Sequence, residues 1–66
     1  MHIVLNGSDR KIPENLSAGA LLQDLGLTGK RLALEINQEI VPRSSFDTRM
    51  LRAGDRVEIV QAIGGG

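Results

Sequence analysis

The last three residues of the chain, Gly64, Gly65 and Gly66, point most directly to chemistry. Glycines add no side chain to a core and raise the conformational entropy that folding must overcome, so folding does not ask for them. Three extended residues carry the terminal carboxylate roughly 10 Å from the last anchored side chain and fit a channel too narrow for any Cβ atom. We therefore predict that the protein presents this carboxylate to a partner. An unused, frayed terminus is the alternative interpretation.

Other residues with chemical potential are few. His2 is the only histidine, and it falls on the expected outer face of the first strand without partners for a ligand or base role. Glu35 and Glu39 straddle a predicted turn, where solvated carboxylates are expected rather than an acid–base pair. No nucleophile–base pair and no phosphate-binding loop is visible. We therefore predict a protein that is not an enzyme and binds no metal or cofactor by itself.

Length and composition narrow the class of protein. A chain of 66 residues forms one small domain, and without cysteine it has neither disulfides nor thiolate metal sites. Eight basic residues balance eight acidic ones, which argues against nucleic-acid and membrane surfaces that need a positive field. No apolar run reaches the length of a membrane span, and no signal-peptide layout is present. We expect a cytoplasmic monomer.

The hydrophobic pattern predicts the elements that carry the tail. Residues 1–5 alternate as a strand, Asn6-Gly7 favours a tight turn, and residues 10–13 are expected to return as a short strand. Residues 16–27 have a helix signature with Ser17 as N-cap and Gly26 as the residue that ends it.

The second half of the chain is predicted to be mostly strand. A hairpin is expected over residues 30–41, with its turn at Asn37-Gln38, followed by an irregular or single-turn helical segment up to Arg52. The final strand is expected over residues 56–61. The economical arrangement is α+β: a mixed sheet of four to five strands, with the first and last strands parallel and one helix packed across it. This is the β-grasp, with a domain over residues 1–61 and a glycine-rich tail over 62–66.

The chain resembles the small sulfur-carrier proteins of thiamine biosynthesis, members of the ubiquitin-like β-grasp group. The resemblance runs almost end to end and rests on the order of several motifs: Ile3-Val4-Leu5-Asn6-Gly7, Leu21-Leu22 with Leu25-Gly26, the run from Glu35 to Arg43, the run from Gly54 to Val60, and the ending Ile63-Gly64-Gly65-Gly66.

This resemblance implies a substrate protein whose terminal glycine is the working group. An E1-like adenylyltransferase uses ATP and magnesium to make an acyl-adenylate, a sulfur donor (a desulfurase or a persulfide) replaces AMP, and the thiocarboxylate goes to thiazole synthase. Gly66 is expected to bear the sulfur, and Ile63, Gly64 and Gly65 to thread into the partner's active site.

The chain is also expected to carry a surface for its partners. Val4, Val60 and Ala62 are predicted to cluster on the outer face of the sheet, because the first and last strands are expected to be neighbours; ordinary surface apolarity is the alternative. Four arginines fall near the rim from which the tail leaves in some arrangements, where they would steer an acidic partner: Arg43, Arg49, Arg52 and Arg56.

Three other functions fit parts of the sequence. A small subunit of molybdopterin synthase shares the fold and the thiocarboxylate, and a ubiquitin-like modifier uses the same glycine for isopeptide bonds. A β-grasp regulatory module of RNA-handling enzymes has a turn like residues 37–41. The glycine ending and the neutral charge count against the regulatory module.

Overall fold

The computed structural model describes residues 1–61. Its elements are, in chain order, β1 (His2–Leu5), β2 (Ser8–Lys11), α1 (Ala18–Asp24), β3 (Leu32–Ile36), β4 (Glu39–Ile40), a 3-10 turn η1 (Arg43–Ser45) and β5 (Arg56–Gln61). The predicted division into a domain and a tail beginning at residue 62 stays a prediction, since residues 62–66 lie outside the described part.

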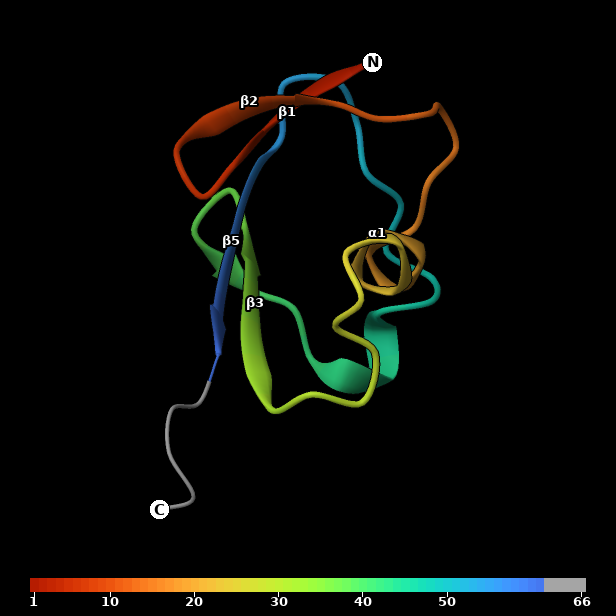
Figure 1. Cartoon of the computed structure of the whole chain (residues 1–66), viewed down its shortest axis with the longest axis vertical. Coiled ribbons are helices and arrows are strands. Elements are labelled where there is room, and N and C mark those ends of the chain that lie inside the picture. The colour runs from red at the N-terminus through yellow and green to blue at the C-terminus, as the bar shows by residue number, and fades with distance from the viewer. Residues whose placement is uncertain (62–66) are drawn as a thin grey trace.

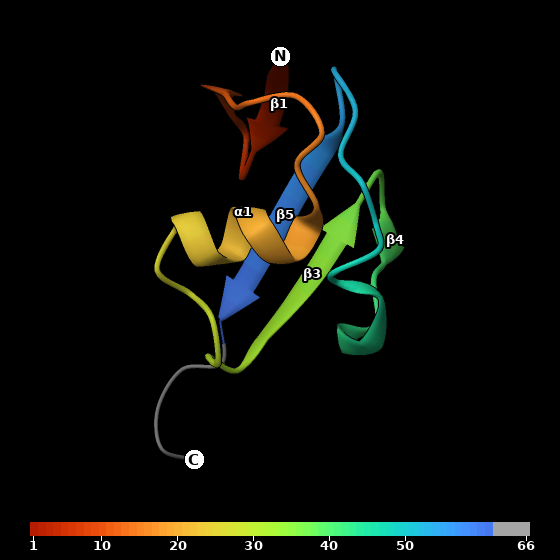
Figure 2. The ribbon, with the colours of Figure 1, turned by 90° about the vertical axis from the view of Figure 1, so that its right-hand side faces the viewer.

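The five strands form one mixed sheet in the order β2-β1-β5-β3-β4. β1 and β5 are parallel, and the other pairs are antiparallel. Figures 1 and 2 show α1 lying across one face of this sheet. The predicted architecture, a mixed sheet of four to five strands with one main helix packed across it, is confirmed, and the sheet has five strands. β5 is the central strand, with one hairpin on each side of it.

Both hairpins turn at two consecutive residues with positive φ. Asn6 and Gly7 have φ of 48° and 83°, and Asn37 and Gln38 have φ of 54° and 68°. Such pairs match the right-handed twist of the flanking strands. The first turn is so tight that pairing resumes at Ser8, opposite Leu5. The returning strand therefore spans Ser8–Lys11 and not residues 10–13 as predicted.

Helix α1 begins and ends at the residues that its sequence indicated. The Ser17 side chain accepts a hydrogen bond from the Ala20 amide at 3.0 Å. At the other end Gly26 has φ of 73°, and the Leu27 amide donates to the Leu22 carbonyl at 2.8 Å, which is the Schellman pattern. Gly19 lies against η1: its amide donates to the Phe46 carbonyl, and a Cβ atom there would meet that oxygen at 3.3 Å.

The core lies between α1 and the covered face of the sheet. Its largest fully buried side chains are Ile3, Leu21, Leu34, Ile36 and Val57. In β1 and β3, the neighbours of β5, every second side chain points into this core, as the alternation of side chains along a strand predicts. In residues 1–61 no helix has the length and apolar character needed to cross a membrane.

Candidate functional site

The end of β5 is the last position that the structure fixes before the predicted working group. Gln61 pairs with Leu32, the first residue of β3, and Val57 further up the same strand is fully buried. Strand β5 therefore stays paired with β3 up to residue 61, the last described residue. The predicted tail residues Ile63, Gly64, Gly65 and Gly66 lie outside the described residues, as does Ala62, and their roles stay predictions.

A buried aspartate anchors the start of β5. Asp55 is 7% exposed and is the only buried polar residue among residues 1–61. Its carboxylate accepts hydrogen bonds from Asn37 Nδ2 at 3.0 Å and from the Arg52 amide at 2.8 Å, and Arg49 lies 3.8 Å away. Asn37 Oδ1 in turn accepts from the Arg56 amide at 3.0 Å. This network joins the β3–β4 turn to the first residue of β5.

A second side chain supports β5 further along. Asn6 Oδ1 accepts a hydrogen bond from the Ile59 amide at 2.8 Å, across 53 residues of sequence. The Asn6 amide donates to the Val57 carbonyl at 2.9 Å. Asn6 thus continues the β1–β5 ladder by one side-chain bond at the point where β1 itself turns away. Neither this contact nor the Asp55 network was predicted from the sequence.

The structure does not bring the predicted surface residues Val4 and Val60 together. In the parallel pair Val4 lies beside Arg56, whereas Val60 lies four residues further along β5, beside Ala33 of β3. Four extended residues span about 13 Å, so the predicted cluster is wrong in its geometry. Val60 is 62% exposed and Val4 is half-buried. Their contact with a partner stays a prediction.

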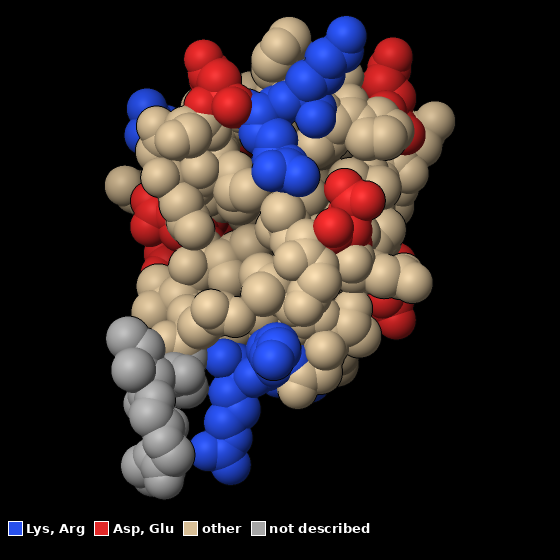
Figure 3. All heavy atoms as spheres, viewed as in Figure 1, with Lys and Arg blue, Asp and Glu red and all other residues tan. Residues whose placement is uncertain are grey.

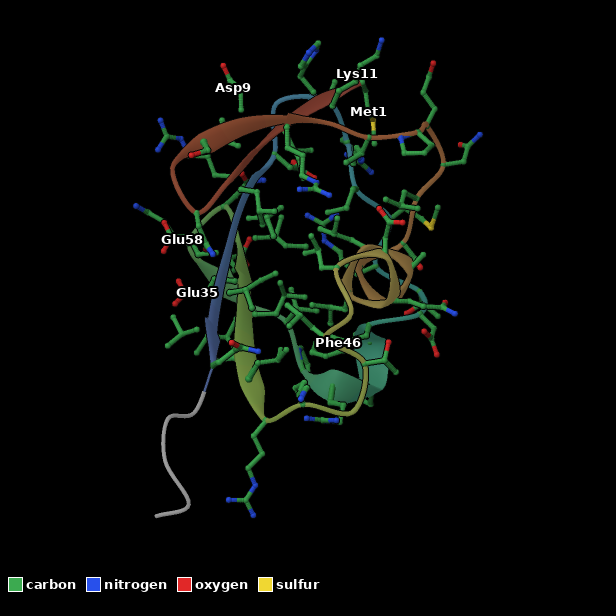
Figure 4. All side chains as sticks on the ribbon, viewed as in Figure 1. Met1, Asp9, Lys11, Glu35, Phe46 and Glu58 are labelled. Atoms are coloured by element: carbon green, nitrogen blue, oxygen red, sulfur yellow. The ribbon has the colours of Figure 1, made fainter. Side chains whose placement is uncertain are left out.

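Two glutamates lie opposite each other on the uncovered face of the sheet. The register pairs Glu35 of β3 with Glu58 of β5, and Ile40 of β4 is the next neighbour of Glu35. Figure 4 shows both carboxylates on the side of the sheet away from α1. Glu39 pairs with Ile36 and so belongs to the other face, which separates it from Glu35. An acid–base pair of Glu35 and Glu39 is therefore not formed.

We expect Glu58→Lys to stabilise the domain by about 0.5 kcal/mol, because it replaces directly opposed like charges with an opposite pair. Urea denaturation at low salt measures the change, which should shrink in high salt. The matched control is Glu14→Lys, which changes net charge equally at an exposed position outside the sheet. An equal shift in the two variants would contradict a specific Glu35–Glu58 repulsion.

Basic residues lie around both ends of β5, but not as predicted. Arg43 donates to the Lys30 carbonyl at 3.2 Å, close to the start of β3 and hence to the end of β5. Arg31 lines a surface hollow together with Val60 and Gln61.

The other three predicted arginines lie at the opposite end of β5. Arg49, Arg52 and Arg56 lie around Asp55, at the start of this strand. Only Arg43 of the four predicted arginines is therefore at the rim where the chain leaves the sheet. In Figure 3, blue basic side chains lie near the top and near the bottom of the molecule.

The described residues contain no group of three or more metal-ligating side chains. His2 lies in β1 and pairs with Lys11 of the edge strand, a neighbour that does not assist ligand or base chemistry. The described residues therefore offer one feature that bears on the predicted chemistry: the central strand β5, paired with β3 up to Gln61, immediately before the predicted tail.

A mixed sheet of this order with one crossing helix is the ubiquitin-like β-grasp, and comparison with known proteins narrows the class further. The model of the ThiS family matches residues 3–66. The crystal structure of the thiamine biosynthesis protein ThiS from Geobacter metallireducens superposes with a TM-score of 0.86 at 30% identity, with both chains fully covered. The chain belongs to the ThiS family.

The relatives in this comparison are of two kinds, which differ in length. The sulfur carrier protein ThiS of Escherichia coli is 32% identical over the whole of both chains. The thiazole synthase of Paramagnetospirillum magneticum is 42% identical over the whole of this chain, which spans only 20% of that protein. A thiazole synthase from Magnetococcus marinus matches in the same way at 33% identity. The resemblance to the sulfur carriers of thiamine biosynthesis is thus confirmed.

Proposed function

We propose that this chain carries sulfur for thiazole formation in thiamine biosynthesis, as a thiocarboxylate on Gly66. It is then a substrate of its partners and not an enzyme, and the proposal places it in the cytoplasm. The observation that carries the proposal is the position of β5: this central strand stays paired with β3 up to Gln61, five residues before the carboxylate. Five residues reach at most roughly 17 Å, enough to enter a partner's active site while the domain stays outside.

The chemistry belongs to the partners. A carboxylate is a poor electrophile, so an E1-like adenylyltransferase first joins a Gly66 oxygen to the α-phosphorus of ATP, with Mg²⁺ neutralising the phosphates, and pyrophosphate leaves. A sulfur nucleophile then attacks the carbonyl carbon, and the C–O bond to AMP breaks. Where that nucleophile is a persulfide, the resulting acyl disulfide is cleaved by a second thiol, which leaves the thiocarboxylate on Gly66 and a disulfide on the donor.

Thiazole synthase is the proposed acceptor of this sulfur. Two relatives that contain a segment like the whole of this chain bear that enzyme's name, and the matching segment is a fifth of each. Linkage of two activities in one chain favours direct transfer between them, because it raises their effective concentration. The same relatives favour the thiamine pathway over the molybdopterin alternative.

The test is the intact mass of the chain after incubation with ATP, Mg²⁺, the adenylyltransferase and a sulfur donor. We expect a gain equal to the mass difference between sulfur and oxygen, and its loss when thiazole synthase and its small-molecule substrates are added. Omission of ATP is the control and should leave the mass unchanged. A chain that gains no sulfur with ATP and every partner present would refute the proposal.

A further inference from the structure

The central strand β5 extends beyond its parallel neighbour β1. The parallel pairs are Val4 with Arg56 and Leu5 with Val57, after which β1 ends. β5 continues to Gln61 and keeps only β3 beside it, as Figure 1 shows. The second half of β5 is therefore paired with β3 on one side. On its other side it has no strand neighbour among residues 1–61.

The backbone groups on that side follow from the hydrogen bonds already described. Along a strand, the backbone groups of every second residue point to the same side. The Val57 carbonyl and the Ile59 amide both face Asn6. The Ile59 carbonyl and the Gln61 amide therefore point to that side as well. Asn6 engages the Val57 carbonyl through its backbone amide and the Ile59 amide through its side chain. Within residues 1–61, no backbone hydrogen bond engages the Ile59 carbonyl or the Gln61 amide from this side.

A surface hollow lies beside this open edge. It has a volume of about 240 Å³ and is lined by four apolar residues, Leu5, Leu25, Leu27 and Ile59, and by two polar ones, Asn6 and Gln61. Leu25 and Leu27 follow directly after α1, which Figure 2 shows crossing in front of β5. A strand added at the edge would point every second side chain into this hollow.

The other two edges of the sheet carry features that discourage pairing. β2 includes three successive charged residues, Asp9, Arg10 and Lys11, with Pro13 close behind, and β4 has only two residues before Pro42 follows. Charges, prolines and short length are the usual protection of edge strands. The segment Ile59–Gln61 has no charge and no proline. It is the one open edge left able to accept a strand in the described part of the chain.

We propose that this edge of β5 is a strand-addition site, occupied by an extended segment of thiazole synthase whose apolar side chain enters the hollow. The inference rests on the proposed function. The occupant is chosen because an enzyme that takes the terminal glycine must surround the chain just beyond Gln61, and because relatives join this domain to thiazole synthase in one chain. Main-chain hydrogen bonds hold such a segment, and the side chain in the hollow selects it.

The first test is binding of the full chain to purified thiazole synthase by calorimetry. Leu27→Lys places a charge in the hollow, and we expect it to raise the dissociation constant about tenfold or more. Leu16→Lys is the matched control: it alters another half-buried leucine, which lines a separate hollow near the start of α1, and should change the constant less than about twofold. Equal constants for Leu27→Lys and the unaltered chain would overturn the proposal.

The second test needs no substitution. In the unaltered chain saturated with thiazole synthase, hydrogen exchange of the Gln61 amide should slow by about tenfold or more, because that amide gains an acceptor. An unchanged exchange rate would overturn strand addition while leaving the sulfur-carrier function intact. Absence of any binding by the unaltered chain contradicts transfer to this enzyme, and with it the assigned occupant.

Discussion

A chain that lacks Gly65 and Gly66 is expected to gain no sulfur, yet to unfold at the same denaturant concentration as the full chain. The last strand, β5, ends at Gln61, and the two deleted glycines have no side chain to pack, so the free energy of unfolding should change by less than about 0.5 kcal/mol. The carboxylate, in contrast, moves back by two residues and no longer reaches the proposed adenylation site. Intact mass after the loading reaction and urea denaturation measure the two effects.

A full-length chain with an amidated C-terminus is the matched control for this deletion. It keeps the length of the tail but has no carboxylate to adenylate, so it should gain no sulfur and should still compete with the unaltered chain for the adenylyltransferase. The shortened chain should compete less well, because part of the tail's contact is gone. Loss of cooperative unfolding in the shortened chain would mean that the tail supports the fold, contrary to the proposal.

Asp55→Ala should be among the most destabilising single substitutions outside the apolar core. It removes the acceptor of Asn37 Nδ2 and of the Arg52 amide, and it leaves Arg49 without its partner. Hydrogen bonds to a charged group contribute about 1.5–3 kcal/mol each, and we expect a total loss of about 3 kcal/mol because water reaches the exposed Asn37 and Arg52. For a domain of this size that is a large share of the total stability.

Urea denaturation followed by circular dichroism measures this loss. The matched control is Asp9→Ala, which removes an exposed aspartate from the edge strand β2 and should change stability by less than about 0.5 kcal/mol. Asp55→Asn keeps one acceptor oxygen and should fall between the two. If Asp55→Ala costs no more than Asp9→Ala, the network around Asp55 does not hold the start of β5.

Local signals explain why most of the fold was predictable. Ser17 and Gly26 mark the ends of α1 through caps that involve neighbours within a few residues, and Asn6-Gly7 specifies its turn in the same way. The small size of the chain then left one economical way to combine the elements. The final strand, Arg56–Gln61, was predicted with its observed bounds.

Contacts between distant residues explain what was missed. Asn37 and Asp55 lie 18 residues apart, and Asn6 and Ile59 lie 53 apart, so no local pattern couples them. No tight turn joins β1 to β5, so no local signal fixes which residues of the two strands lie side by side. The sequence therefore predicted correctly that these strands are neighbours but wrongly placed Val4 near Val60. One signal was available: Asn6 and Asn37 both occupy turns with positive φ, where an asparagine side chain commonly forms a hydrogen bond to backbone.

The central place of β5 also governs how the chain acquires its structure. β1 and β3 do not pair with each other, and only β5 joins the two hairpins into one sheet. The pairing of residue 4 with residue 56 closes a loop that contains most of the chain. Closing so long a loop has a high entropic cost, so we expect this pairing to form late in folding. During synthesis the sheet therefore stays in two separate halves until residues 56–61 have been made. An interrupted chain has no completed sheet, so the folded domain forms only in molecules whose synthesis has come within a few residues of the proposed sulfur-bearing glycine.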